Sequence, residues 1–144
     1  MEPSEVRARV LAEHAKLREM LANIDLMVKQ LEQGRLRDSD NLFGLAQKIR
    51  ELLEEHMATE ERWLVPSLLR TDWGEIRANR ILEEHATQRI ALERLEGFEE
   101  ERNARKLGRE LMAISALLIE EMQQEEAECL GVDLLGDASL VRTQ

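Results

Sequence analysis

Apolar side chains recur along this chain at steps of three and four residues, the spacing that places them on one face of an α-helix. The first such run follows Ser4, a residue type favoured at helix N-termini, and extends to about Gln33, where Gly34 ends it. The second begins at about Leu42. It runs to Pro66, which lacks a backbone donor, so we expect this helix to kink or end there.

Two further amphipathic runs complete the pattern. The segment Asp72–Glu75 resembles a capping box with Asp72 as the N-cap, and it predicts a third helix over residues 73–96. Gly97 is expected to stop that helix. A fourth helix is expected over residues 103–129.

The connecting and terminal segments carry fewer signals. Asp38 or Asp40 is expected to cap the second helix. The length of 144 residues predicts one all-α domain over residues 1–144. Its C-terminal tail, residues 130–144, is expected either to fray or to pack on the helices through three apolar residues, Val132, Leu134 and Leu135.

Ionisable side chains interrupt the apolar stripes. They are His14 in the first helix, His56 and Glu60 in the second, His85 in the third, and Glu121 and Glu125 in the fourth. Positions four residues apart share a helix face, so each of the two pairs projects from one side of its helix. Buried ionisable groups are costly unless they are paired or bind a metal. We therefore infer a metal site around His56 and Glu60, with the remaining groups supplied by the other helices.

Each of these residues can also be explained without a metal ion. A lone histidine on an apolar face is usually a hydrogen-bonded core group, and acidic helices often contain pairs of glutamates. Two observations favour the metal site. The segment 56–61 aligns without gaps on 121–126, which favours an inward Glu121 and Glu125 over the alternative register. In an up-down bundle, all six groups would lie roughly 15 Å from the same end, at a rise of 1.5 Å per residue.

Composition narrows the class of protein. Hydrophobic residues make up 43% and charged residues 35%, and the net charge of -10 argues against a nucleic-acid partner. The single cysteine, Cys129, cannot form an internal disulfide and is expected to be a buried small apolar group. The N-terminal residues resemble no secretion signal, and no apolar run is long enough for a membrane span. We expect a cytoplasmic protein with no membrane partner.

The motif His56-x-x-x-Glu60-Glu61-x-x-Leu64-x-Pro66-x-Leu68 resembles the second-helix motif of the hemerythrin-like, HHE cation-binding proteins. The segment Leu82-Glu83-Glu84-His85 fits the same layout, and the resemblance covers essentially the whole chain. It implies an up-down-up-down four-helix bundle that holds two non-haem iron ions. By this likeness His14 and His56 would bind one metal, while Glu60 and a carboxylate of the fourth helix would bridge both.

Two positions depart from the family pattern. Arg89 stands where oxygen carriers of the family have a second third-helix histidine, and the fourth helix has no histidine. Glu121 is the best substitute for the missing histidine, with Glu125 as the bridging acid. In the alternative register Met122 replaces the histidine and Glu126 bridges. The second metal would then rely on His85, Glu121 and the shared carboxylates, and an inward Arg89 would compete with it.

Three imidazoles and three carboxylates can serve two divalent metals, and this donor set suits iron, manganese or zinc. The resemblance favours iron and a protein that binds or senses dioxygen, nitric oxide, peroxide or iron rather than an enzyme. Reversible dioxygen carriage is the least favoured role. One alternative is a single-metal site of His14, His56, Glu60 and one fourth-helix acid, with Arg89 paired to Glu121. Another is a metal-free interaction module that uses Trp63, Trp73 and the tail. The sequence leaves the oligomeric state open.

Overall fold

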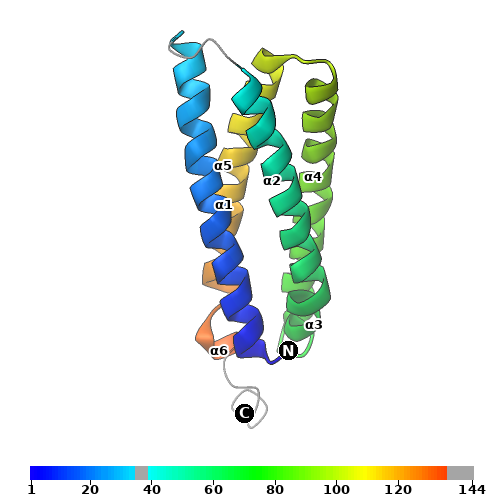
Figure 1. The fold of residues 1–144 in the computed structure, drawn as a ribbon. Coiled ribbons are helices and arrows are strands. Elements are labelled where there is room, and N and C mark those ends of the chain that lie inside the picture. The colour runs from blue at the N-terminus through cyan, green and yellow to red at the C-terminus, as the bar shows by residue number, and fades with distance from the viewer. Residues whose placement is uncertain (35–38, 136–144) are drawn as a thin grey trace.

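The long helices of the protein run alternately up and down, as a computed structural model of residues 1–34 and 39–135 shows (Figure 1). The elements are α1 (Pro3–Glu32), α2 (Asp40–Thr59), the π-helical turn η1 (Glu60–Leu64), α3 (Val65–Leu68), α4 (Gly74–Glu100), α5 (Ala104–Glu128) and α6 (Val132–Leu135). α1 packs against α2 and α5, and α4 packs against α5 and α2. The described residues include no strand. The predicted all-α, up-down-up-down bundle is therefore confirmed. None of these helices is long and apolar enough to cross a membrane.

The helix starts follow local chemistry with small shifts from the prediction. α1 begins one residue before Ser4, because Pro3 suits the first helical position, where its missing N–H costs nothing. α2 begins at Asp40, with Ser39 rather than Asp40 in the N-cap position. Asp38, the other predicted cap, lies outside the described residues. α5 is capped by Asn103, whose side chain accepts a hydrogen bond of 3.1 Å from the backbone of Lys106.

Two predicted boundaries of α4 are wrong. Asp72 does not cap the helix: Trp73 holds the N-cap position in a left-handed conformation, with φ 63°, and no side chain caps the end. Gly74 allows this turn to close, because a Cβ there would lie 1.7 Å from the carbonyl oxygen of Leu68. Gly97 does not stop the helix, which continues to Glu100. A glycine inside a helix costs only about 1 kcal/mol, so packing of the flanking turns prevails.

The second long helix does not end at Pro66. Its backbone widens into η1 and then continues as α3. Pro66 has no N–H to offer to the carbonyl of Arg62, four residues earlier. The N–H of Val65 instead bonds to the carbonyl of Glu60, five residues earlier. This wider turn buries Glu60 and Leu64 together, so the proline helps to place the carboxylate.

The core consists of two apolar clusters separated by a polar layer. One cluster contains Val10, near the N-terminal end of α1, and the other contains Leu17, further along the same helix. His14 lies between these two residues. The same order holds on α5, where Glu125 separates Met122 from Cys129. The buried histidines and glutamates of the layer are His14, His56, Glu60, His85 and Glu125. The bundle therefore interrupts its own apolar core at one level.

Burial changes sharply between neighbouring residues on α4 and in the tail. Ile81 is buried whereas Leu82 is 42% exposed, and Gln88 rather than Arg89 is buried on α4. In the tail, Leu135 is buried and Leu134 packs beside it, but Val132 is 64% exposed, so its expected packing is wrong. The rest of the tail, residues 136–144, lies outside the described part of the chain.

Candidate metal centre

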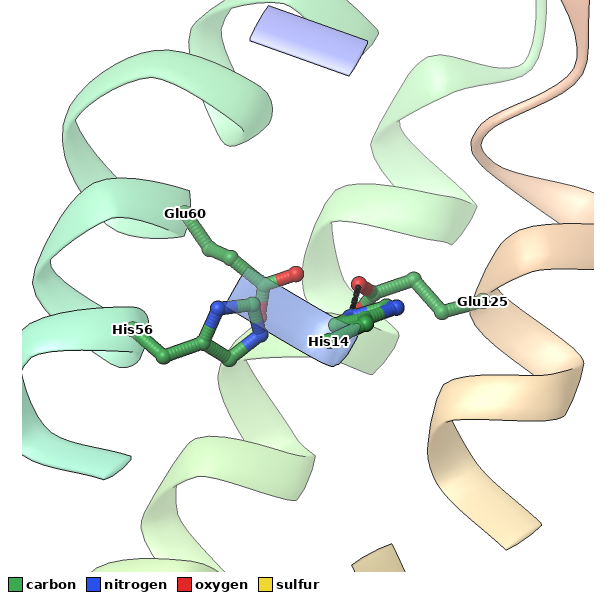
Figure 2. Close-up of side chains that lie close together, drawn as sticks. All are labelled: His14, His56, Glu60 and Glu125. Atoms are coloured by element: carbon green, nitrogen blue, oxygen red, sulfur yellow. Dashed lines mark ion pairs between the residues drawn. The ribbon is translucent and has the colours of Figure 1, made fainter. Parts of the chain in front are cut away.

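Four side chains of the polar layer converge on one point. Figure 2 shows His14 from α1, His56 from α2, Glu60 from η1 and Glu125 from α5 pointing toward one another. Each offers one ligand atom, and these atoms all lie within 4.8 Å of one another. All four residues are at most 8% exposed. Two nitrogen and two oxygen donors in a dry core form a donor set that a divalent metal ion accepts.

A small internal cavity of about 10 Å³ lies between these side chains. A volume of this size holds about one water-sized particle. The cavity has an apolar wall of Leu17, Leu53, Leu118 and Met122. Its remaining lining is polar and consists of the four converging side chains together with Glu84, Gln88 and Glu121.

Each histidine of the layer is held from behind by a carboxylate. The three distances from Nδ1 to the carboxylate oxygen are 2.7 Å each. Each carboxylate is held in turn by a third group, and the sets are His14 with Glu126 and Arg18, His56 with Glu13 and Thr59, and His85 with Glu61 and Arg89. When Nδ1–H donates a hydrogen bond to the outer carboxylate, the Nε2 lone pair is left free to face inward.

The inward nitrogens face carboxylates at short range. The Nε2 atom of His14 lies 2.9 Å from Glu125 Oε1, and that of His56 lies 3.4 Å from Glu60 Oε1. The approach of His14 to Glu125 lacks hydrogen-bond geometry, and both atoms are buried without a partner, as is Glu60 Oε2. A lone pair facing a carboxylate is favourable only when a proton or a metal ion lies between them.

The pKa values of the layer respond to this crowding of buried ionisable groups. Burial, followed by the neighbouring Glu125, raises the pKa of Glu60 well above its usual value and so favours its neutral form. Burial alone would raise the pKa of Glu125 as well, but interactions with Glu60 and His14 lower it below the ordinary range. Burial alone would lower the pKa of His14, but the adjacent carboxylates of Glu125 and Glu126 raise it. Because carboxylates and imidazoles bind metal ions in their deprotonated forms, a metal ion would compete with protons for these atoms.

The other residues expected at the site lie around these four. His85 is buried, and its Nε2 atom lies 2.8 Å from Glu60 Oε1. Glu121 is half-buried, lines the cavity and accepts a hydrogen bond from Gln88. Of the two residues that the alternative register proposed, Met122 forms part of the apolar wall of the cavity. Glu126 lies behind His14 and away from the converging atoms.

Arg89 lies outside the polar layer. Its side chain is 50% exposed and forms an ion pair of 2.7 Å with Glu61. The expected pair between Arg89 and Glu121 is wrong, because Glu121 is bonded to Gln88 instead. The guanidinium therefore leaves the cavity free and supports the carboxylate behind His85.

The sequence reasoning missed Gln88 and the three outer carboxylates. Gln88 belongs to a stripe of buried positions on α4, namely 81, 85, 88, 92 and 95, which are separated by alternating steps of four and three residues. Extending the stripe from His85 by three residues rather than four would have found it. The outer carboxylates are 24 to 112 residues away in sequence from their histidines, and no local pattern pairs them with those histidines.

A comparison with protein-family models gives one match, the hemerythrin HHE cation-binding domain, over residues 6–131. This confirms the resemblance that the motif of the second helix suggested. No curated protein and no solved structure matches the chain significantly.

Proposed function

Because the chain belongs to the hemerythrin HHE cation-binding domain family, we propose that its polar layer is a metal centre. The first ion would be held by His14, His56, Glu60 and Glu125. The observation that supports this is the convergence of four buried ligand atoms within 4.8 Å of one another. A metal ion there would meet three buried atoms that have no hydrogen-bond partner, His14 Nε2, Glu60 Oε2 and Glu125 Oε1.

We further propose that the centre is a non-haem site for two ions and that the metal is iron. Glu60 and Glu125 would bridge the ions, and His85 and Glu121 would complete the second position. His85 is oriented like the other two histidines, with Nδ1 on an outer carboxylate and Nε2 toward Glu60. The donor set also accepts manganese or zinc. The family relationship favours iron.

The side chains of this chain prepare the site for the ion. The outer carboxylates fix which ring nitrogen carries the proton and which faces inward. The apolar wall of the cavity excludes bulk water and strengthens the electrostatic interactions inside. Bound iron would supply an open coordination position for a small ligand such as dioxygen, nitric oxide or peroxide. Such a centre suits a binding or sensing protein.

Two alternatives remain distinct proposals. In a single-ion centre, the hydrogen bond from Gln88 to Glu121 would occupy the second position. In a metal-free interaction module, protons alone would hold the layer. Trp73, which is 78% exposed at the start of α4, would then be the residue to test on the surface.

Metal stoichiometry separates these proposals. The full chain would be stripped with chelator, reconstituted anaerobically with ferrous iron, desalted and analysed for elements. Two irons per chain support the two-ion centre, one supports the single-ion centre, and none contradicts both. Glu60→Gln should lose metal, whereas the exposed Glu55→Gln on the same helix should retain it and serves as the charge-matched control.

A further inference from the structure

A second cavity, of about 510 Å³, lies at the end of the bundle where α1 ends and α2 and α5 begin (Figure 1). Ligand pockets in proteins usually occupy about 300–1,000 Å³, so this cavity has room for a small organic molecule. Val28, which lines it, lies about 20 Å along α1 from His14, at a rise of about 1.5 Å per residue. The cavity is therefore separate from the polar layer, and we call it the end cavity.

The end cavity has an apolar floor and a charged rim. The buried side chains of Val28 and Leu42 belong to the floor. The rim carries the exposed Arg105 and Arg109 of α5 and the exposed Glu32 of α1. Two arginines and one glutamate leave one net positive charge. This charge, in a chain whose net charge is -10, complements a monoanion that carries an apolar group.

Gly108 enlarges the end cavity at a cost to its helix. It is a buried residue within α5, and a glycine inside a helix is destabilising relative to alanine. Packing between the helices does not require a glycine here. An added Cβ would lie 3.7 Å from Val28 Cγ1 and 3.9 Å from Leu42 Cδ2, which are ordinary van der Waals distances. The missing side chain leaves space beside the floor, and a bound apolar group would recover the lost contacts.

The two arginines of the rim are held by no carboxylate of the protein. They lie four residues apart on α5, where like charges repel each other. Within the part of the chain that the structure describes, neither guanidinium takes part in an ion pair or a hydrogen bond. Their neighbour Arg102 differs, because it is paired with Asp40. A carboxylate between Arg105 and Arg109 would accept hydrogen bonds from both and relieve their repulsion.

We propose that the end cavity binds a small organic monoanion, an apolar body that ends in a carboxylate. The carboxylate is held between Arg105 and Arg109, and the apolar body covers the floor beside Gly108. Glu32 on the rim repels a second negative charge, so a monoanion is preferred to a doubly charged phosphate. This binding function goes beyond the metal centre and does not depend on it.

Octanoate is a suitable probe, because it combines the carboxylate with an apolar body. The full chain would be titrated calorimetrically with octanoate, octanol and acetate. Chelator is present throughout, so that no bound metal ion offers the carboxylate another site. We expect one octanoate per chain. Octanol lacks the charge and acetate lacks the apolar body, so each should bind about tenfold more weakly or worse. No octanoate binding at millimolar concentration, or equal binding of octanol, would overturn the proposal.

Substitutions on the rim test the carboxylate site. Arg105→Gln and Arg109→Gln should each weaken octanoate binding about tenfold or more, because each removes one charged donor. Lys106→Gln is the control. It removes the same charge from an exposed neighbouring position that does not line the end cavity, so it should bind octanoate like the wild type. Equal octanoate affinities in all three variants would overturn the proposal.

Filling the end cavity tests the site of the apolar body. Gly108→Leu should abolish octanoate binding, whereas Gly108→Ala adds one methyl group at ordinary contact distance and should weaken it less. Circular dichroism checks that each variant is folded. Wild-type octanoate affinity in a folded Gly108→Leu would overturn the proposal. If Gly108→Leu does not fold, the exposed arginine variants decide the question by themselves.

Discussion

Replacing Glu13 by glutamine should weaken metal binding without removing any of the four converging ligands. Glu13 accepts a hydrogen bond of 2.7 Å from His56 Nδ1 and one of 2.8 Å from the hydroxyl of Thr59. Its side chain is only 17% exposed, so water replaces these contacts poorly. Glutamine retains an acceptor oxygen for the imidazole N–H and loses the negative charge. The substitution therefore isolates the effect of that charge on metal binding by His56.

The expected loss follows from the number of contacts. Removing a carboxylate behind a metal-binding histidine typically lowers affinity by about 10- to 100-fold, which corresponds to about 1.4 to 2.8 kcal/mol. Glu13→Gln keeps both hydrogen-bond partners satisfied, so about tenfold is expected. Glu13→Leu leaves His56 Nδ1 and the Thr59 hydroxyl without their shared acceptor, so about 100-fold is expected.

Isothermal titration of the stripped protein with Zn²⁺ at pH 7 measures both losses. Glu19→Gln, at an exposed position of the same helix, removes the same charge and is the control. Equal affinities for Glu13→Gln and Glu19→Gln would refute the argument that the outer carboxylate tunes the histidine.

The stability of the metal-free protein gives a second measurement on Glu13. Burial alone would raise its pKa, but the hydrogen bonds from His56 and Thr59 lower it below the ordinary value of 4.5. A carboxylate whose pKa is lower in the folded state stabilises the protein above its unfolded pKa. The stability difference between the wild type and Glu13→Gln should thus be full above about pH 4.5 and shrink as the pH falls further. A difference that grows toward acid pH would contradict this sign.

Three further predictions concern the rest of the molecule. Gly74→Ala should lower the free energy of unfolding by about 2 kcal/mol or more, because its Cβ would meet the carbonyl of Leu68. Gly97→Ala should raise the free energy of unfolding by about 0.5–1 kcal/mol, because its Cβ would lie in open space and alanine favours the helix. Denaturant titration of both variants tests the pair, and equal effects would contradict it. Burial raises the pKa of Cys129 to about 12, so the native thiol should not react with a disulfide reagent at pH 8 until the protein is unfolded. Zn²⁺ at 100 times its Kd should raise the free energy of unfolding of the wild type by about 2.7 kcal/mol. The same Zn²⁺ concentration should stabilise His56→Ala far less, and thermal unfolding with and without chelator measures both effects.

Helical periodicity was sufficient to predict that the three histidines are buried. His14, His56 and His85 each lie in register with leucines or isoleucines, and an apolar face has to be buried, so the histidines are buried with it. The alignment of 56–61 on 121–126 favoured Glu125 over Glu126, and Glu125 is the one that lies beside His14 Nε2.

The helix ends and the partners of the histidines depend on packing between helices. Gly97 is a stop signal by itself, yet the turns on both sides of it pack into the bundle and α4 continues. The chain has 30 acidic residues, and which of them lies behind a histidine depends on how neighbouring helices are rotated. Arg89 and Gln88 show how fine this dependence is, since one step along α4 exchanges an exposed guanidinium for a buried amide.

The polar layer is difficult to explain as a device for stability. Replacing a buried ionic layer by well-packed apolar residues is often neutral or stabilising, and the apolar clusters above and below it would then join. The bundle instead carries three histidines with a carboxylate on each side, and Pro66 widens the helix where Glu60 enters the layer. With outer carboxylates on every Nδ1, the inward nitrogens can exchange a proton for a metal ion without moving. An arrangement that tolerates both occupants at a cost in packing is what a cation-binding centre requires of its fold.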